Sequence, residues 1–312
     1  MLRVRKTALT IMAGLMLVAV SACSSSAATP AVGGTSNPGA TQAASGPTAS
    51  AAVTANPNDP NSIITQAIGS GVAVTSFHIK LTVSGTVNAS ALSSAAGSAG
   101  TISGNLKLDG TSGEGDVDVA NQAAHLALSV PALPMLGNAP LTGDLILVSN
   151  NLYYKVSLLG TKYTMVPLGS LTSGLGALAS SLPIPSAAAV ATTSLTDEVA
   201  QLRAAMVQAG VTATLVGVEQ IGGQSADHIS FSVPLDMLNS EMAAAASPSP
   251  APKIDSASVD LWVYTSNYQI AQLEIKGASS TLGNLDLAVT VSNYDKPVTI
   301  AAPPASEVQT TP

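Results

Sequence analysis

The stretch Ser76-Phe-His-Ile-Lys-Leu-Thr-Val-Ser-Gly-Thr-Val87 decides the fold of this chain. Its apolar residues, Phe77, Ile79, Leu81 and Val83, alternate with polar ones. A period of two residues is that of a β-strand with one face on a core and the other in solvent. The sequence therefore predicts a half-buried strand here.

The same alternation returns along the rest of the chain. Further strand-like runs cover residues 102–108, 113–119, 124–130, 144–148, 152–156, 162–166, 211–221, 226–233, 258–265, 270–277 and 285–291. Tight-turn residues such as Ser149-Asn150-Asn151 and Gly222-Gly223 separate several of them. Short, evenly spaced strands joined by turns favour an antiparallel meander, here of about ten to twelve strands. We expect one α+β domain over residues 59–303 and a disordered tail over 304–312.

Helical spacing interrupts this pattern in a few places. A short helix is expected after the Asn58-Asp59-Pro60-Asn61 start, and others over residues 195–208 and 234–242. A leucine stripe predicts one more helix, ended by prolines, at Leu168, Leu171, Leu175, Leu178 and Leu182. Residues 89–100 and 243–252 have the composition of loose insertions.

The N-terminus has the layout of a secretory leader. Basic residues Arg3, Arg5 and Lys6 precede an apolar stretch over residues 8–20. This stretch is shorter than the roughly 20 residues that a spanning helix needs. The sole cysteine, Cys23, directly follows Val20-Ser21-Ala22, which resembles a bacterial lipobox. The resemblance implies lipidation of the Cys23 thiol and cleavage before it, leaving residues 1–22 as a signal peptide. The alternative is an ordinary signal peptide that ends near a cysteine.

The segment after Cys23 has almost nothing to bury. Residues 24–58 carry no charged side chain, and their only large apolar residues are Val32 and Val53. Such a segment cannot offset its ordering entropy by burial, so we expect residues 23–58 to form a lipidated, disordered tether. Its r.m.s. span would be roughly 30–35 Å. It either carries O-linked sugars or is a plain spacer. The expected location is the extracytoplasmic face of the cell membrane.

Charge excludes some partners. Loss of residues 1–22 lowers Lys and Arg from 11 to 8 against 18 Asp and Glu, so the mature chain is near −10. A nucleic-acid partner needs a basic face, and docking on anionic lipid needs clustered Lys or Arg. An acidic chain argues against both kinds of binding. With its sole thiol acylated, the chain has no disulfide. We expect a monomer held on the membrane by acylated Cys23.

The residues that usually carry catalysis are scarce. His78, His125 and His228 fall on separate predicted strands in the polar phase, and no metal-binding spacing, nucleophile elbow, P-loop or dinucleotide fingerprint occurs. Asp116 and Asp118 favour a solvated strand face, with calcium binding as the alternative. Arg203 is the only arginine after the leader. We therefore expect no enzyme and no cofactor. A hydrolase, which would need the histidines to converge with carboxylates, remains a third hypothesis.

Four segments together resemble a known family. These are the Ser76-Phe77 opening strand, Gly217-Val-Glu-Gln-Ile-Gly-Gly-Gln224, Val259-Asp-Leu-Trp-Val263 and Val291-Ser-Asn-Tyr-Asp-Lys-Pro-Val-Thr-Ile-Ala-Ala-Pro303. With the lipobox and tether, the chain resembles the mycobacterial LppX/LprAFG-type lipoproteins over residues 60–303. The resemblance implies a LolA/LolB-like half-barrel with helices on its concave side. It also implies a hydrophobic cavity that takes acyl chains of lipids or glycolipids and carries them through the cell envelope.

Strand phase and the leucine stripe give the candidate cavity residues. They are Phe77, Ile79, Leu81, Val83, Leu126, Leu128, Leu171, Leu175, Leu178, Ile229, Phe231, Leu261 and Leu287. With only two Phe and one Trp, these aliphatic residues could either pack to a solid core or leave ligand space. The main hypothesis is a lipid carrier that meets an envelope transport protein. The alternative is a cell-surface sensor or interaction module on the same fold that carries no lipid.

Overall fold

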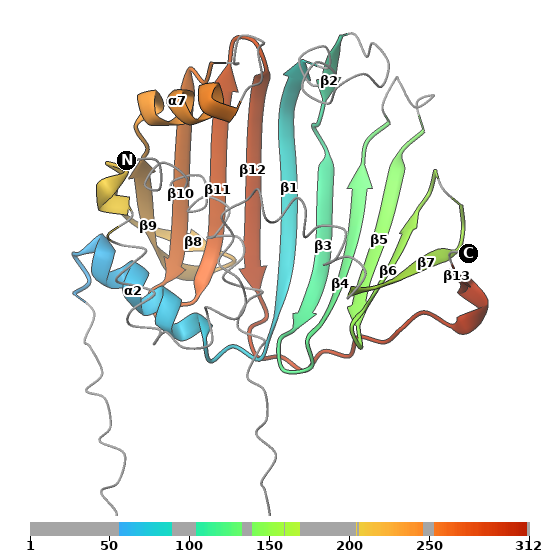
Figure 1. The fold of residues 1–312 in the computed structure, drawn as a ribbon. Coiled ribbons are helices and arrows are strands. Elements are labelled where there is room, and N and C mark those ends of the chain that lie inside the picture. The colour runs from blue at the N-terminus through green and yellow to red at the C-terminus, as the bar shows by residue number, and fades with distance from the viewer. Residues whose placement is uncertain are drawn as a thin grey trace, which may run out of the picture.

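The computed structural model describes residues 56–88, 104–132, 139–158, 160–168, 204, 206–245 and 253–310. Cys23, most of the tether and the helical stripe at Leu171, Leu175 and Leu178 lie outside these residues, so the predictions made for them stay predictions. Within the described part, a single open sheet of 13 strands dominates the fold (Figure 1).

The strands follow one another across the sheet as a meander, except that β1 lies between β3 and β12. Their bounds are β1 Ser76–Asn88, β2 Asn105–Lys107, β3 Thr111–Asp118, β4 Ala123–Val130, β5 Leu141–Val148, β6 Asn151–Val156, β7 Tyr163–Pro167, β8 Thr212–Ile221, β9 Gln224–Ser232, β10 Ser256–Tyr264, β11 Ile270–Ser279, β12 Gly283–Ser292 and β13 Val308–Thr310. The order across the sheet is β13-β7-β6-β5-β4-β3-β1-β12-β11-β10-β9-β8, and β2 pairs with β1. The N-terminal strand β1 thus lies in the centre and joins two meanders.

The predicted fold class is confirmed: the sheet is large, curved and antiparallel, with few helices among the described residues, and it is not closed into a barrel. The predicted turns have the local geometry that hairpins need. Ser149 and Asn150 have φ of 51° and 59°, and Gly222 and Gly223 have φ of 59° and 82°. Positive φ at both central residues suits a two-residue hairpin whose twist matches the strands.

The expected disordered tail instead contains a short 3-10 helix and a strand. Ala305–Glu307 forms the helix η2, and β13 pairs with β7 in parallel. A strand of three residues is too short to show a period in the sequence, which is why periodicity does not predict it.

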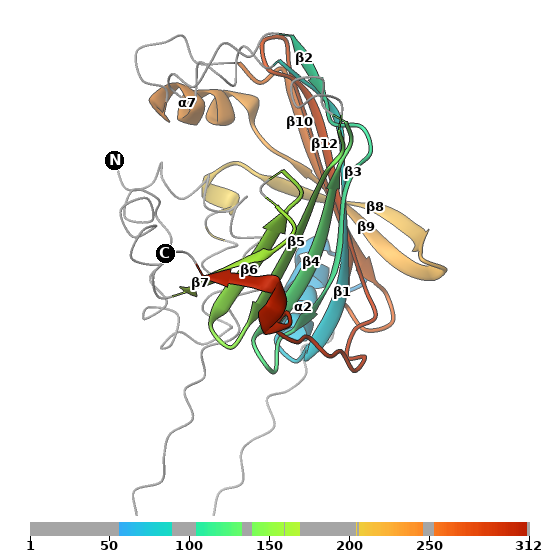
Figure 2. The same cartoon turned by 90° about the vertical axis from the view of Figure 1, so that its right-hand side faces the viewer.

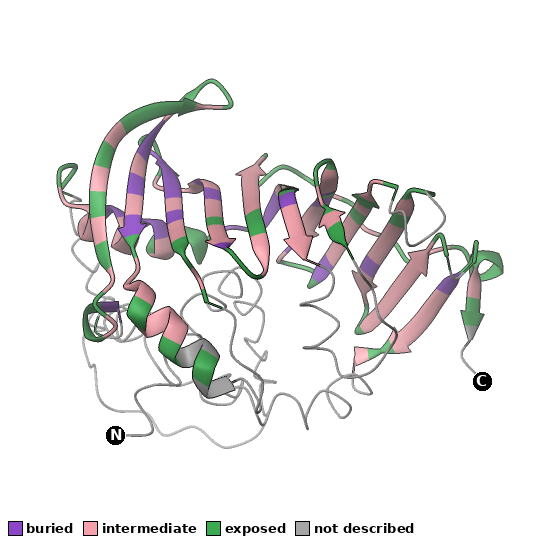
Figure 3. Ribbon diagram, turned by 90° about the horizontal axis from the view of Figure 1, so that it is seen from above, coloured by how far each residue is buried: buried purple, intermediate pink, exposed green. Residues whose placement is uncertain are grey.

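Two described α-helices accompany the sheet. Helix α2, Pro60–Gly71, begins as predicted, because the Asp59 carboxylate caps it by accepting from the Asn61 N–H and Pro60 occupies its first turn. Helix α7, Leu235–Ala245, follows β9. Both lie on the same side of the sheet (Figure 2), and the sheet curves around that side (Figure 3).

The main core lies between α2 and the β8–β11 part of the sheet. Ile63 and Ala67 of α2 pack in one cluster with buried residues of the sheet, among them Ile229, Leu261 and Val263. Ile63, Ile229 and Val263 have no exposed surface. Apolar burial of this kind is the main source of stability in such a domain.

Candidate functional site

One face of the sheet is apolar across almost its full width. Residues opposite each other in neighbouring strands point to the same face, so the register tells which side chains share it. From Ile79 and Leu81 on β1, the register leads across β12, β11, β10 and β9 in one direction and across β4, β5 and β6 in the other. We call this side the apolar face. It carries Ile229, Phe231, Val259, Leu261, Leu273, Ile275, Leu287, Val289, Leu126, Leu128, Leu145 and Leu147.

The register brings every strand candidate from the sequence onto this face. Phe77, Ile79, Leu81 and Val83 share it on β1 through their partners on β12 and β3, and Leu126, Leu128, Ile229, Phe231, Leu261 and Leu287 share it on the other strands. That these side chains contact acyl chains stays a prediction.

Packing on the apolar face is uneven. Toward α2, the side chains of Ile229 and Leu261 are 0% and 3% exposed. Across β12, β1 and β4–β6, the aliphatic side chains that continue the same face are only half-buried, for example Leu287, Leu81 and Leu126. Figure 3 shows the difference as buried residues gathered on the strands at one end of the sheet. The face therefore extends well beyond the part that forms a closed core.

Two glycines leave the apolar face without side chains on either side of Leu128. Gly113 on β3 and Gly143 on β5 lie opposite Leu128 in the register. A Cβ at Gly113 would lie 2.8 Å from Leu128 Cδ2, whereas one at Gly143 would lie 3.6 Å from Leu128 Cβ, an ordinary contact. Leu128 thus leans over Gly113, and the surface beside it at Gly143 has room for added carbon atoms.

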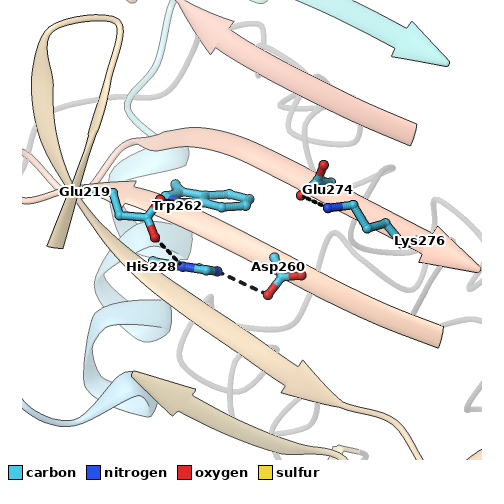
Figure 4. Close-up of polar contacts among 6 residues, drawn as sticks. All are labelled: Glu219, His228, Asp260, Trp262, Glu274 and Lys276. Atoms are coloured by element: carbon cyan, nitrogen blue, oxygen red, sulfur yellow. Dashed lines mark hydrogen bonds and ion pairs between the residues drawn. The ribbon is translucent and has the colours of Figure 1, made fainter. Parts of the chain in front are cut away.

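The opposite side of the sheet, which we call the polar face, carries the three histidines and their carboxylate partners. On β9, His228 Nδ1 lies 2.8 Å from Glu219 Oε1 and its Nε2 lies 3.1 Å from Asp260 Oδ1 (Figure 4). Its ring stacks on the indole of Trp262 at 4.3 Å, and Trp262 Nε1 donates to Glu219 Oε2 at 2.9 Å. The hydrogen bonds from Trp262 and then from His228 lower the pKa of the Glu219 carboxyl. This group ties β8, β9 and β10 together.

The other histidines lie in separate groups. His78 Nδ1 lies 2.9 Å from Asp116 Oδ1, and its Nε2 lies 3.3 Å from Glu114 Oε1. His125 Nε2 lies 2.7 Å from Asp144 Oδ1. In the register His78 and His125 flank Asp116 on neighbouring strands, and each of the three histidines contacts a carboxylate on an adjacent strand. Sequence reasoning placed them on the polar phase but missed these partners, which become visible only once the strand register is known.

Asp144 also anchors a tyrosine at the β7 side of the polar face. The Tyr163 hydroxyl donates to Asp144 Oδ2 at 2.5 Å, and Lys155 Nζ donates to the Tyr163 hydroxyl at 3.2 Å. The ammonium lies 4.3 Å from the Tyr163 ring centroid, a cation–π contact. Burial raises the pKa of Tyr163, and its hydrogen bond raises the pKa of Lys155. These contacts join β5, β6 and β7.

The described part of the chain has neither a cluster of metal-binding side chains nor a membrane-spanning helix. It contains no group of three or more His, Cys, Asp or Glu side chains placed to hold a metal ion. Asp116 contacts His78, whereas Asp118 accepts from the backbone and side-chain amides of Asn121. Among the helices of the described ranges, none is long and apolar enough to cross a membrane.

Comparison with known proteins gives distant likenesses of fold. No family model and no curated protein matches the chain. Among solved structures it is similar to the Mycobacterium tuberculosis lipoprotein LppX, with 16% identity, 77% of this chain and 97% of that chain covered, and a TM-score of 0.43. LprF from Mycobacterium bovis gives 17% identity, coverages of 78% and 96% and a TM-score of 0.38.

A third likeness is weaker. A putative outer membrane lipoprotein-sorting protein domain from Vibrio parahaemolyticus is 5% identical, with coverages of 71% and 87% and a TM-score of 0.20. At these identities the similarity concerns the fold, and the function has to be argued from the residues of this chain. Fold and site together define a curved-sheet protein with an apolar concave face and a polar outer face.

Proposed function

We propose that this protein is a membrane-anchored, extracytoplasmic lipoprotein that binds acyl chains of a lipid or glycolipid on the apolar face and carries them through the cell envelope. One observation carries the proposal: the apolar face continues from the closed cluster near α2 across β12, β1 and β4–β6, where its aliphatic side chains are only half-buried. An acyl chain is the simplest ligand for a surface of this width and chemistry.

Energetics support this ligand class. Each methylene removed from water contributes about 0.8 kcal/mol, so a C16 chain contributes about 12 kcal/mol before the costs of ordering. Binding of this kind needs a dry apolar surface and no catalytic group. The titratable clusters described above all lie on the polar face, away from this surface. The proposed protein is therefore a carrier without cofactor and not an enzyme.

Acylated Cys23 would supply the membrane attachment. One acyl chain binds a bilayer marginally, whereas two or more hold firmly, so the lipobox reading predicts stable anchoring. The tether that follows would let the domain move some tens of ångströms from the bilayer. In this proposal the domain acts as a monomer that exchanges its lipid with the membrane and with an envelope transport protein.

A sensor or interaction module is the second candidate. Val216 and Val218 on β8 are 57% and 62% exposed, and β8 ends the strand order of the described sheet. Exposed apolar residues on an edge strand are suited to contact with another protein. This function would need no lipid on the apolar face.

The test is native mass spectrometry with lipid extraction on the mature chain purified from bacterial membranes. Leu126→Gln places an amide on the apolar face, and Ala127→Gln places the same amide on the polar face of the same strand as the matched control. We expect near-stoichiometric acyl lipid on the parent chain and the control, and its loss from Leu126→Gln. A ligand-free mass for all three after incubation with phospholipid and glycolipid would favour the interaction module.

A further inference from the structure

The C-terminal segment after β12 crosses half of the sheet without joining the meander. Residues 293–307 run along the lower edge of the sheet in Figure 1, from the end of β12 past β1 toward β7, and the chain then forms β13. We call residues 293–310 the strap. β13 pairs with β7 in parallel, whereas the other strand pairs of the described sheet are antiparallel. The strap therefore connects the central strand to the far edge.

The first end of the strap is firmly anchored beside β1. The Asp295 N–H donates to Ser76 O, and Asp295 Oδ1 accepts from the Thr75 N–H at 2.8 Å and the Thr75 hydroxyl at 2.9 Å. Ser76, only 5% exposed, donates its hydroxyl to Lys296 O at 2.6 Å. The Tyr294 hydroxyl donates to Ile270 O at 2.6 Å. Three successive residues, Tyr294, Asp295 and Lys296, thus make several exposed and partly buried hydrogen bonds, and their number makes this end the fixed one.

The middle of the strap has little slack. Residues 297–304 contain Pro297, Pro303 and Pro304 and adopt no helix or strand. The backbone hydrogen bond recorded for them is at their far end, where the Glu307 N–H donates to Pro304 O at the start of η2. An extended proline-rich chain rises about 3.1 Å per residue, so this stretch reaches about 25 Å. The strap ends on β13, six steps from β1 in the strand order, which at about 4.8 Å each make about 29 Å. With the three residues of η2 at about 2.0 Å each, residues 297–307 reach about 31 Å. The strap is thus an almost fully extended chord across this half of the sheet.

The second end is held weakly. Among the described residues, β13 contributes the register pairs Val308–Tyr163, Gln309–Thr164 and Thr310–Met165 and a side-chain hydrogen bond from Gln309 Nε2 to Thr164 Oγ1 at 3.0 Å. Glu307 and Gln309 are exposed, and Val308 is half-buried. Short, exposed pairing at the edge of a sheet belongs to the parts of a fold that open with the lowest free energy, and β13 ends the strand order of the described sheet.

We propose that β13 is a releasable clasp, and that its departure from β7 lets the β4–β7 half of the sheet open so that acyl chains reach or leave the apolar face. With the clasp closed, a chord without slack limits how far these strands can flatten. With it open, β5–β7 keep their antiparallel pairing and the contacts among Asp144, Lys155 and Tyr163, but the strap no longer limits the curvature. The inference rests on the proposed lipid-binding function and concerns how the same face is loaded.

A disulfide across the clasp tests this inference. Thr164→Cys with Gln309→Cys joins register partners, whose Cα atoms in paired strands lie about 4.8 Å apart, within the range that a disulfide spans. The chain also carries Cys23→Ser, so that no third thiol is present. Thr82→Cys with Ala288→Cys joins β1 to β12 on the polar face in the part of the sheet that stays closed, and it serves as the matched control.

Two readouts keep this inference separate from the proposed function. Hydrogen exchange of the β7 amides reports clasp opening without any ligand, and stopped-flow uptake of a fluorescent C16 fatty acid reports loading. Since both depend on the population of the open state, we expect the clasp disulfide to slow each by at least about ten-fold, reductant to restore both, and the control disulfide to change neither.

Unchanged exchange in the oxidised clasp variant would show that β13 is not a releasable end, and slowed exchange with unchanged uptake would show that the clasp does not gate the apolar face. Either result overturns the inference while leaving lipid binding intact. If neither the parent chain nor any variant takes up the fatty acid, the proposed lipid-binding function fails, and the role of the clasp in loading lipid fails with it. Hydrogen exchange then still shows whether β13 leaves β7.

Discussion

The uneven packing of the apolar face predicts that equal truncations will cost unequal amounts of stability. Ile229→Ala removes side-chain carbon from a residue that has no exposed surface and packs in the closed cluster under α2. The lost transfer free energy is about 2.4 kcal/mol for three carbons at about 0.8 kcal/mol each. The cavity left among rigid neighbours raises the total to about 3–4 kcal/mol.

Leu126→Ala removes the same number of carbons from the half-buried part of the same face. Because Leu126 keeps part of its surface accessible, the transfer loss is about half as large, and no closed cavity forms. We expect about 1 kcal/mol. The two variants should therefore differ by about 2–3 kcal/mol in the free energy of unfolding, although the residues face the same side of one sheet.

Urea unfolding followed by circular dichroism measures both costs, with an unchanged slope as the check that neither variant alters the unfolded state. Saturating acyl ligand adds a second comparison, because ligand at 100 times its Kd raises stability by about 2.7 kcal/mol. That increment should survive Ile229→Ala and shrink in Leu126→Ala. A cost of about 3 kcal/mol for both truncations would refute the reasoning, since it would mean that the whole face is a solid core with no surface left for a lipid.

Three further predictions follow from single residues. Gly143→Ala should raise stability by about 0.4–1 kcal/mol, because its Cβ meets only ordinary contacts and the unfolded chain loses conformational freedom. Gly115→Ala should lower stability, because its Cβ would overlap the His125 carbonyl. Thermal unfolding measures both variants, and equal effects would contradict the strand register. Because the pKa of Glu219 is lowered in the folded state, its contribution to stability is present above the carboxyl's unfolded pKa and is lost as pH falls through the folded pKa. Glu219→Gln should therefore remove this part of the stability loss in acid, measured by Trp262 fluorescence during acid unfolding. An unchanged acid unfolding curve would argue against the Glu219–Trp262 hydrogen bond. Burial raises the pKa of Asp227, so the stability of the folded protein falls as pH rises from the unfolded to the folded pKa of this carboxyl. Asp227→Asn should therefore stabilise the protein at pH 7 but not below the unfolded pKa. Destabilisation by Asn at pH 7 would show that the carboxylate has a partner that the fold needs.

Much of the fold follows from the sequence because a strand's period is rigid. In β1 and β4 the alternation is unbroken, so Phe77 to Val83 and Leu126 to Leu128 fall on the face that their phase predicts. The turn residues likewise predict the β5–β6 and β8–β9 hairpins. The candidates that share the apolar face were found by phase alone.

Other features depend on contacts that no local pattern contains. The register shifts between Leu215 and Gly217 on β8 and between Trp262 and Val263 on β10. Each shift changes which side chains meet beyond it, and the first belongs to the stretch of β8 that brings Glu219 to Trp262. The carboxylate partners of the histidines depend on register in the same way. The central place of β1, paired with both β3 and β12, is a long-range choice that turn signals between successive strands cannot reveal.

That central strand explains how one sheet can contain a rigid part and a loose part. Over β8–β11, the apolar face is closed by α2 and the polar face is cross-linked through Trp262, His228 and Asp260. On the β3 side, β5, β6 and β7 are joined by their antiparallel pairing and by the side chains of Asp144, Lys155 and Tyr163, and β13 of the strap pairs with β7. A ligand that enters between strands and covering segments must displace the weaker packing first, because local opening follows the lowest free energy. Lipid uptake is therefore expected at the β4–β7 half, while the α2 cluster keeps the fold intact during exchange.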